Sequence, residues 1–585
     1  MAYIDRVNRK LLREFGGRVG AREGDGCLVL EGELENWADV VRAGMLAAAK
    51  PGLFKKSRYR GLVNRIRFLG APIPPMETPA AEDASLEGEA PDVLVVGAGI
   101  SGCAIARELA RFNLKILLVD KEHDVAKHAS SRNDGMVHPG IDLRKGSLKH
   151  YYNRRGNALY DRITRELGVD FERTGQYLCF SRPWFKPLLY LSLLYWKWLG
   201  VGGVRVIGRE ELHRNEPGLG ADLGMALFFP SAGIVCPYGL TIAYGENAVQ
   251  NGVMLRLDTA VLGMTVEGGR VTQVRTNRGR VYPRVVVNAA GVFAEDIATM
   301  AGDRFFSIHP RRGTSAILDK KAAPFLVRTI ASKIGTSSMN AHTKGGGIVR
   351  TVHGNLLVGP DAVETYEKEN FATHPGSIEA AFDKFKATSP GLSPGQIITY
   401  FTGVRAPTYE EDFVVCKGIR TANLVHAAGI QSPGLTAAPA IALDIAQFVK
   451  ELLEASGRTV EANRHFNPIR RPIPHTARMG TEERRALIEK NPDYGVILCR
   501  CEEVSKGEIL ESLRRPIPCD TLDGVKRRVR PGMGRCQGGF CGPLVLRLIA
   551  GEKAVPPEEV TKDGPGSAIL WGPTKKGGES EKNEG

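Results

Sequence analysis

Apolar residues follow helical and strand-like spacing along most of this chain, and glycine-rich turns separate the patterns. In the first 70 residues, apolar positions 4, 7, 11 and 12 predict a helix, and the run CLVLEGEL (27–34) predicts a strand. WADVVRAGMLAAA (37–49) predicts a second helix and LVNRIRF (62–68) a second strand. These elements predict a small α+β module at residues 1–70.

The pattern breaks at several later points and so divides the chain. Residues 71–90, rich in proline, alanine and glutamate, predict an extended linker. Residues 91–455 contain no such break and predict one large domain or two interleaved ones. Residues 456–492 are polar and contain prolines, so they predict a surface connector, and 493–551 form a module rich in cysteine. Residues 552–585 are a tail, of which 573–585 carry no apolar side chain and predict disorder.

The longest apolar stretch is Leu188–Val204, which Ser192 and Lys197 interrupt. It is too short and too broken to span a membrane. We expect it to form a buried helix of the large domain. The alternative is a helix that lies in a membrane interface, with four aromatic rings at headgroup level. These rings are Tyr190, Tyr195, Trp196 and Trp198.

Composition limits the class of protein. The 585 residues are 43% hydrophobic and 25% charged, which excludes a small disulfide scaffold and wholesale disorder. Glycine makes up 68 of 585 residues, about 12%, against about 7% in average proteins. Without a collagen-like period, this excess indicates many tight turns and close approaches of backbone to ligand.

The formal charge of +14 comes from 79 basic and 65 acidic residues that are spread along the chain. Because there is no basic run and no basic stripe interleaved with aromatics, we expect no nucleic acid partner and instead a small anionic substrate. The first residues lack the basic and apolar pattern of a signal peptide. We therefore expect a cytoplasmic protein without structural disulfides, with peripheral association at the inner face of the cell membrane as a further option.

A dinucleotide-binding motif starts the large domain. The apolar run DVLVV (92–96) leads into Gly97-Ala98-Gly99-Ile-Ser-Gly102 and then into a helical pattern. The first glycine permits a tight turn, the second lets a pyrophosphate approach the backbone, and the third permits close packing of helix on strand. The next strand, KILLVD, ends in Asp120, where a carboxylate can hold ribose hydroxyls.

Further polar or glycine-rich loops favour FAD over NAD as the dinucleotide. They are HASSRNDGMVHPGID (128–142), VVVNAAGVFAEDIATMAG (285–302) and VHAAGIQSPGLTAAPAIALDIAQFV (425–449). The last two each read as strand, turn and helix. Spread over more than 300 residues, these loops imply an extended cofactor that is buried across the domain.

These motifs resemble the FAD-dependent oxidoreductases of the D-amino-acid-oxidase superfamily over residues 92–449. SSRNDGMVHPGI, NAAGVFAEDIA, HPRRGT, LLVGPDAVET and AGIQSPGLTAAPAIA are similar to anaerobic-type glycerol-3-phosphate dehydrogenases and their L-2-hydroxyglutarate oxidase relatives. The resemblance implies an α/β fold, in which a glutathione-reductase-like FAD-binding domain is interleaved with an α+β substrate domain. Residues 1–70 look like a BON module, whose members associate with membranes or partners.

The resemblance also implies further residues that contact FAD. They are Lys121, Ser131, Asn133, Gly135, Val261, Gly291, Gly429, Gly434, Leu435 and Thr436.

Oxidation of an anionic secondary alcohol needs a base for the hydroxyl proton and a cation for the anionic end. By their place in the motifs, His138 is the candidate base, and Arg312 in HPRRGT and Arg405 in TGVRAPTYEEDF are the candidate clamps. His353 is a weaker candidate. The alternatives are that His138 is a structural histidine and that the two arginines form salt bridges at the surface or at a domain interface. RRGTSAILD lacks the acid that many relatives carry after the glycine, so the substrate stays open.

Five of the ten cysteines lie between residues 499 and 541. Cys499-Arg-Cys501 and Cys536-(x)₄-Cys541 form two close pairs whose four thiolates can converge on a metal. Zinc is the alternative metal, although structural zinc sites usually place two to four residues between the cysteines of a pair, and Cys499-Arg-Cys501 has only one. CRCEEVSKGEI and LDGVKRRVRPGMGRCQGGFCGP resemble the bacterioferritin-associated-ferredoxin-like [2Fe-2S] domain, a small helical fold.

This second resemblance implies that Cys499, Cys501, Cys536 and Cys541 ligate iron and that Cys519 does not. Six basic residues are expected to offset the negative charge of the cluster. They are Arg500, Lys526, Arg527, Arg528, Arg530 and Arg535. A basic patch that docks a partner is the alternative for these residues.

A flavin accepts electrons in pairs, and a two-iron cluster passes them singly. Both centres in one chain imply a dehydrogenase that exports electrons to a separate protein, either a reductase or a quinone-linked subunit. The resemblance implies oxidation of sn-glycerol 3-phosphate to dihydroxyacetone phosphate. The alternatives are a dehydrogenase for L-2-hydroxyglutarate, another 2-hydroxy acid or an amine, and an electron-transfer subunit without an organic substrate of its own.

Overall fold

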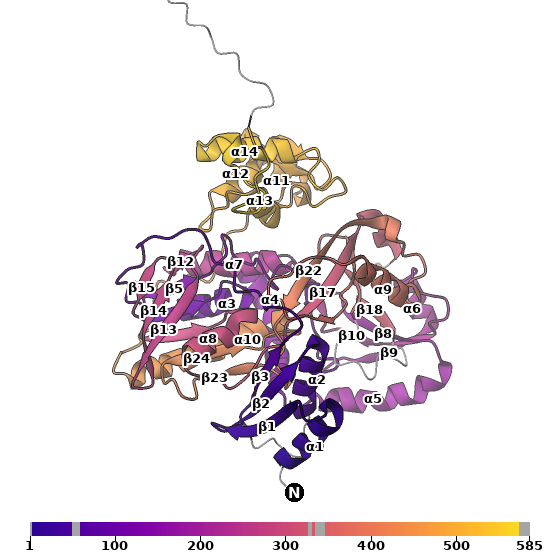
Figure 1. The fold of residues 1–585 in the computed structure, drawn as a ribbon. Helices are drawn as coiled ribbons and strands as arrows, with labels where there is room; N and C mark the ends of the chain where they lie inside the picture. Colours follow the sequence, from indigo (N-terminus) through magenta and orange to yellow (C-terminus); the bar gives the residue numbers. More distant parts are fainter. Residues whose placement is uncertain (1–2, 49–58, 326–329, 334–345, 573–585) are drawn as a thin grey trace, which may run out of the picture. The chain divides into compact units, whose positions relative to one another are not determined.

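The computed structural model describes residues 3–48, 59–325, 330–333 and 346–572. It divides into two compact units, residues 1–470 and 471–585. The first unit contains the large sheets, and the second is a small, mainly helical fold (Figure 1). The expected disorder at 573–585 lies outside the described residues.

A six-stranded sheet forms the centre of the first unit, in the order β12-β5-β4-β16-β24-β23, parallel except for β23. β4, β5, β16 and β24 are buried at every position, which is why their sequences read as unbroken apolar runs instead of alternating ones. The strands span β4 Val93–Val96, β5 Ile116–Val119, β12 Met254–Arg256, β16 Val285–Asn288, β23 Val414–Lys417 and β24 Leu424–Ala428.

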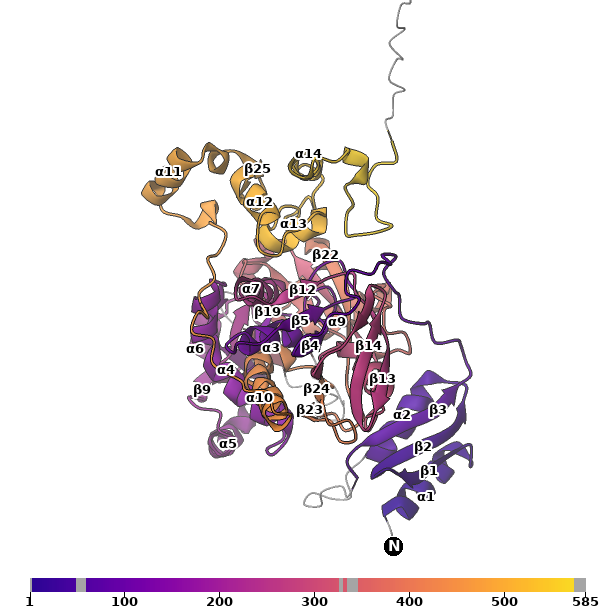
Figure 2. The same cartoon turned by 90° about the vertical axis from the view of Figure 1, so that its left-hand side faces the viewer.

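Helices line this sheet. α10 (Gly434–Ala455) packs against both α3 (Ile100–Leu109) and α4 (Leu148–Leu167), and α7 (Pro237–Gln250) packs against α3 (Figure 2). A core cluster joins strand residues of the sheet to α8 (Ala294–Met300) and to a β-meander. The meander strands are β13 Val261–Glu267, β14 Arg270–Thr276 and β15 Gly279–Val281. The three strand-turn-helix units expected from the sequence are thus confirmed.

A second, mixed sheet in the same unit matches the expected α+β substrate domain. Its order is β21-β17-β20-β19-β18-β8-β10-β9, and β22 pairs with β17. The strands span β8 Gln176–Phe180, β9 Arg205–Gly208, β10 Met225–Phe229, β17 Arg311–Leu318, β18 Ile330–Lys333, β19 Gly347–Arg350, β20 Leu356–Gly359, β21 Val363–Glu364 and β22 Ile397–Arg405. One core cluster joins this sheet to α6 (Arg209–Asn215) and α9 (Pro375–Lys386). β6 (Met136–Val137), β11 (Gly233–Val235) and β7 (Phe171–Glu172) form a small separate sheet.

The described part of residues 1–70 forms a three-stranded sheet with two helices. Besides the expected elements, the structure has β1 (Val19–Gly24), which the sequence analysis missed because VGAREG is short, half polar and bounded by glycine. The order is α1 (Tyr3–Phe15), β1, β2 (Cys27–Leu34), α2 (Trp37–Ala48) and β3 (Leu62–Phe68). The BON resemblance stays a prediction.

The start of β2 is buried on both faces of the N-terminal sheet. Leu28, Leu30 and Leu34 of β2 pack on the side of α1 and α2, while Cys27 and Val29 join a core cluster that includes phenylalanines 305 and 306. Two apolar faces explain why β2 begins with the unbroken run CLVL. Residues 1–70 therefore share their core with the large domain.

Tyr409 is the centre of this contact. Its ring belongs to the core of residues 1–70, and its hydroxyl accepts a hydrogen bond from Asn64 Nδ2 at 2.8 Å. Gly44 of α2 lies so close that a Cβ there would come within 2.1 Å of the ring. Only glycine fits under this ring without a shift.

The apolar stretch at 188–204 differs from our expectation. It forms α5 (Lys186–Trp198), but within that helix only Leu189 and Trp196 are buried. The prediction of a buried helix is wrong, because the helix packs on the mixed sheet through one side only. Among the described helices, none is long and apolar enough to cross a bilayer.

The linker and the connector differ in how they pack. Within 71–90 most side chains are exposed, but Leu86 is buried in the core beside the meander. The connector divides at residue 470: Arg470 pairs with Glu246 at 2.5 Å in the first unit, and later residues belong to the second.

The second unit contains one apolar core. β25 (Ile497–Cys499) pairs with β26 (Val504–Ser505), and Ser505 caps α12 (Lys506–Leu513) through a reciprocal bond with Glu508. α11 (Thr481–Lys490), α13 (Leu522–Val529) and α14 (Gly542–Lys553) complete the helices. Within the tail, Val560 is buried in this core and Ile569 packs against it. The domain boundaries stay a prediction.

Replacing Gly44 with alanine tests the contact with Tyr409. Alanine normally stabilises a helix by up to about 1 kcal/mol relative to glycine, but the overpacked ring should cost about 1–3 kcal/mol. We expect Gly44→Ala to lower the midpoint of thermal unfolding. Gly376→Ala in α9 is the control, because a Cβ on Gly376 would meet no atom within 4 Å. Equal midpoints for both variants would contradict the contact.

Candidate functional site

The turn after β4 has the geometry that a dinucleotide needs. Gly97 has φ +105°, and a Cβ on it would lie 2.5 Å from the carbonyl oxygen of Ala289. A Cβ on Gly102 would lie 1.7 Å from the carbonyl oxygen of Gly97. Both positions therefore require glycine, as the motif predicts. Gly99 faces the cavity beside the turn, so the backbone there is open to a phosphate.

Asp120 lies directly after β5 and lines the same cavity. Its carboxylate accepts hydrogen bonds from the backbone N–H of Ala98 at 2.6 Å and of Glu122 at 2.9 Å. Burial raises the pKa of Asp120, although these two donors act to lower it. Asp120 thus ties the turn to the end of the neighbouring strand, which is where a ribose would lie.

A cavity of about 910 Å³ extends from this turn to the mixed sheet. Its size is at the upper end of the range for small-molecule and cofactor sites. Of the residues expected from the sequence, the following line it: Gly97, Gly99, Asp120, Lys121, Asn133, His138, Val261, Gly291, Arg405, Gly434 and Leu435. Residues separated by more than 300 positions therefore meet at one site that suits an extended dinucleotide.

Several expected FAD contacts support the wall instead of lining it: Ala98, Gly102, Ser131, Gly135, Gly429 and Thr436. A Cβ on Gly135 would lie 2.3 Å from the carbonyl oxygen of Val235, so this glycine serves close packing. Ser131 donates to backbone carbonyls in its own turn. Thr436 Oγ1 accepts the backbone N–H of His138 at 2.8 Å and so positions that segment.

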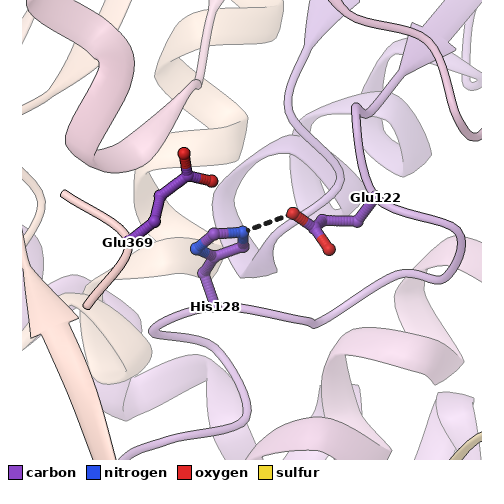
Figure 3. Close-up of side chains that lie close together, drawn as sticks. All are labelled: Glu122, His128 and Glu369. Atoms are coloured by element: carbon purple, nitrogen blue, oxygen red, sulfur yellow. Dashed lines mark hydrogen bonds and ion pairs between the residues drawn. The ribbon is translucent and has the colours of Figure 1, made fainter. Parts of the chain in front are cut away.

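Three side chains near Asp120 form a cluster that resembles a metal site. Figure 3 shows His128 with its ring directed at Glu122, 2.8 Å away, and Glu369 on the other side. The Lys121 ammonium, however, pairs with Glu122 at 2.8 Å and with Glu369 at 2.5 Å. Because this lysine already supplies the positive charge, we assign the cluster to an ion-pair network next to the cavity.

At the opposite end, one predicted clamp lies outside the residues that line the cavity. Arg312 does not line the cavity, and its Nη1 lies 2.6 Å from His374 Nε2 in an exposed contact. Its neighbour Arg311 lines the cavity, because adjacent residues of β17 point to opposite faces. Arg311 was missed, although the motif HPRRGT contains it.

Arg311 and Arg405 are direct cross-strand partners on β17 and β22. Arg311 is 2% exposed and pairs with Glu364 at 2.5 Å and with Glu411 at 2.8 Å, so its charge is balanced. Arg405 donates to the carbonyl oxygen of Asp361 at 2.8 Å, and in the described part of the chain it forms no ion pair with a carboxylate. Burial, followed by the nearby Arg311, lowers the pKa of Arg405. Arg405 thus lines the cavity with a charge that no carboxylate of the described residues contacts as an ion pair.

His138, the predicted base, also lines the cavity. Its carbonyl oxygen accepts hydrogen bonds from Asn153 and Asn157, which fix the backbone, and its Nε2 lies 3.3 Å from Ser432 Oγ. His353 does not line the cavity, so the structure gives this weaker candidate no place in the site.

Two acidic residues of the cavity wall, in the stretch TYEED, were not singled out from the sequence. Glu410 accepts the backbone N–H of Leu62 at 2.7 Å, which links the wall to strand β3 of the N-terminal sheet. Burial raises the pKa of Glu410 to about 7. Burial acts in the same direction on Glu411, but Arg311 and Lys149 outweigh it and lower the pKa.

The four predicted iron ligands lie together in the second unit. Cys501 Sγ lies 3.6 Å from Cys536 Sγ, and Cys499 forms a hydrogen bond with Cys541. That bond, together with backbone N–H donors of Gly532 and Glu502, lowers the pKa of Cys499 to about 6. Two adjacent pairs, with amide donors directed at sulfur, fit a two-iron cluster. Cys519 is also buried, and its thiol lies 3.6 Å from the carbonyl oxygen of Ser512.

Several of the basic residues expected to offset the cluster charge have carboxylate partners instead. Arg527 pairs with Asp563 at 3.0 Å and Arg530 with Glu502 at 3.0 Å. Lys526 lies 4.0 Å from Asp523. Their charge is thus partly balanced within the unit.

Comparison with protein families agrees with both sites. Residues 92–448 match the FAD dependent oxidoreductase family, and residues 497–551 match the BFD-like [2Fe-2S] binding domain. Apart from Met76, the residues that line the cavity lie within the first match, and the four cysteines lie within the second. The cofactors of the chain are therefore FAD and a [2Fe-2S] cluster.

Individual proteins are similar over most of the chain. A glycerol 3-phosphate dehydrogenase of Caloramator mitchellensis is 37% identical over 492 residues, which cover 83% of this chain and 99% of that protein. The anaerobic glycerol-3-phosphate dehydrogenase subunit A1 of Haloferax volcanii is 25% identical and covers 79% of this chain and 83% of its own length.

Among solved structures, the dithionite-reduced L-alpha-glycerophosphate oxidase of Mycoplasma pneumoniae, with FAD bound, superposes with a TM-score of 0.60. It is 24% identical and covers 65% of this chain and 98% of its own. This match supports the fold.

Serine variants test the ligand set of the cluster. Cys501→Ser and Cys536→Ser should each lower the iron content and the visible cluster absorption, because a neutral hydroxyl is a poor iron ligand. Cys519→Ser should keep both. The measurement is iron per protein together with the electron paramagnetic resonance signal after reduction. Loss of the cluster in Cys519→Ser with retention in Cys501→Ser would contradict this assignment.

The two wall carboxylates should affect stability with opposite dependence on pH. A raised pKa in the folded state means that the contribution of Glu410 is present at low pH and lost as pH rises toward about 7. Relative to wild type, Glu410→Gln should therefore become more stable between pH 5 and 8. Glu411 has a lowered pKa, so Glu411→Gln should be less stable than wild type above pH 4.5, and the difference should shrink as the pH falls below that ordinary value. The measurement is the thermal midpoint from about pH 3 to 8, and the same pH trend in both variants would contradict the prediction.

Proposed function

The chain belongs to the FAD dependent oxidoreductase family, and from this premise we propose that it oxidises sn-glycerol 3-phosphate to dihydroxyacetone phosphate. The names of the relatives that cover most of this chain support this substrate. The reaction removes a hydride from the middle carbon and a proton from its hydroxyl group, that is, two electrons and two protons.

The observation that carries the proposal is the charge of Arg405. Arg311 and Arg405 face each other across β17 and β22. Two glutamates neutralise Arg311, whereas no carboxylate among the described residues forms an ion pair with Arg405. A guanidinium in this state binds a phosphate oxygen through charge-assisted hydrogen bonds. Arg405 is therefore the anchor for the anionic end of the substrate.

His138 is the proposed base. Its imidazole lines the cavity, while Thr436, Asn153 and Asn157 hold its backbone in place. In this role, a ring nitrogen accepts the hydroxyl proton as the carbon–hydrogen bond breaks. When bound, FAD supplies the two-electron acceptor and the [2Fe-2S] cluster supplies a one-electron carrier.

We propose that the electrons leave to a separate electron-accepting protein. Cys501 is exposed in the second unit, so one ligand of the cluster lies at its surface. The Haloferax volcanii relative is named as a subunit, which supports a multi-protein route for electrons.

Anaerobic reduction of the bound flavin tests the substrate. We expect sn-glycerol 3-phosphate to bleach the flavin band near about 450 nm in the holoenzyme. Loss of a charged hydrogen bond should raise the half-reducing substrate concentration about 10- to 100-fold in Arg405→Ala. Arg312→Ala is the matched control, and it should stay near wild type because its side chain does not line the cavity.

The alternatives give different results in the same experiment. Bleaching by L-2-hydroxyglutarate or an amine, but not by sn-glycerol 3-phosphate, would overturn the substrate. Bleaching by none of them would favour an electron-transfer subunit. An equal effect of Arg312→Ala and Arg405→Ala would overturn the role of Arg405.

A further inference from the structure

Helix α5 exposes an unusual apolar surface. Over only 15 residues, seven large apolar side chains are at least half exposed. They are Trp184 59%, Leu188 51%, Tyr190 53%, Leu191 64%, Leu194 71%, Tyr195 50% and Trp198 57%. We call these residues the α5 surface. A patch of this kind marks an interaction site, whereas single exposed apolar residues are ordinary.

The inner side of the same helix is anchored. Leu189 and Trp196 are 4% and 8% exposed and pack against Phe180, Leu227 and Phe229 of the mixed sheet. Trp196 also meets Phe229 edge to face, with ring centroids 5.0 Å apart. The outer side chains are therefore held on a firm base.

The charge along the chain segment that contains the α5 surface has one sign. Between Glu172 and Glu210 the chain contains no acidic residue but six basic ones. Arg182, Lys186 and Lys197 are exposed, and among the described residues none of them forms an ion pair. Lys145 lies 3.8 Å from the Trp198 ring, which adds a further cation at the end of the helix.

The chemistry of these side chains points to lipid. Tryptophan and tyrosine prefer the headgroup level of a bilayer, leucine enters the acyl boundary, and lysine and arginine attract anionic headgroups. A protein partner would need acidic groups to complement Arg182, Lys186 and Lys197. A second copy of this helix carries the same basic residues, so the two copies would repel each other. A helix of 13 residues is about 20 Å long, too short for a hydrocarbon core of about 30 Å, so it would lie in the interface plane.

We propose that the α5 surface binds the face of a bilayer that contains anionic phospholipids. The leucines enter the acyl boundary, the aromatic rings sit at headgroup level, and Arg182, Lys186 and Lys197 meet the headgroups. The inference is independent of the substrate, because α5 and its charges lie outside the residues that line the cavity.

Vesicle binding by the holoenzyme tests this proposal. Wild type should sediment with vesicles of phosphatidylcholine and phosphatidylglycerol, bind less to phosphatidylcholine alone, and be released in part by salt. Tryptophan fluorescence should shift to shorter wavelength on binding, because Trp184 and Trp198 leave water.

Two pairs of variants separate the contributions. Leu191→Gln/Leu194→Gln should weaken vesicle binding about tenfold or more, while Leu12→Gln, equally exposed on α1, should not change it. Lys197→Glu should weaken binding to anionic vesicles by about tenfold, and Lys10→Glu should not. Flavin reduction by substrate and the thermal midpoint should stay at the wild-type level in all four.

Other outcomes would overturn the proposal. One is wild type that fails to bind anionic vesicles. A second is vesicle binding that Leu191→Gln/Leu194→Gln leaves unchanged. A third is a self-associated wild type that this double variant converts to monomer without any vesicle binding, which would assign the α5 surface to contact between copies of the chain.

Discussion

The close approach of three backbone segments at Gly97 is the constraint on which the first unit depends. The turn after β4, the start of α3 and the end of β16 meet within contact distance, and a side chain on Gly97 or Gly102 would strike a carbonyl oxygen. This contact sets the floor of the cavity at the carboxyl ends of parallel strands, where open α/β sheets bind ligands. Asp120, which accepts the N–H of Ala98, ties the next strand into the same corner.

Charge pairing decides the character of the other end of the cavity. Arg311, Glu364, Glu411 and Lys149 neutralise one another in a chain of ion pairs, so their proximity adds little net charge. Arg405 lies beside this series of ion pairs, and no carboxylate among the described residues forms an ion pair with it. One positive charge is therefore left for an anion. The wall that carries Glu410 and Tyr409 also receives Leu62 and Asn64 from the N-terminal sheet. Residues 1–70 are thus part of the support of the site.

Much of the site could be predicted because its chemistry depends on local order along the chain. A strand, a glycine turn, a helix and a second strand that ends in aspartate identify the dinucleotide site without any distant contact. Likewise, the spacing of Cys499, Cys501, Cys536 and Cys541 is a property of the sequence, and the fold brings Cys501 and Cys536 together. The interleaved domain could be anticipated from the resemblance, since its glycine-rich motifs occur in order.

The sequence by itself determined the two cofactor motifs, the parallel strands that are buried on both faces, and the identity of the cysteine ligands that we propose. Only the tertiary structure decided which of two adjacent arginines lines the cavity, because a shift of one residue along a strand reverses its face. It also decided that α5 is exposed, since apolar composition does not tell how many sides of a helix find a partner. The support of the cavity wall by residues 1–70 likewise depends on contacts between positions more than 300 residues apart, which no local pattern records.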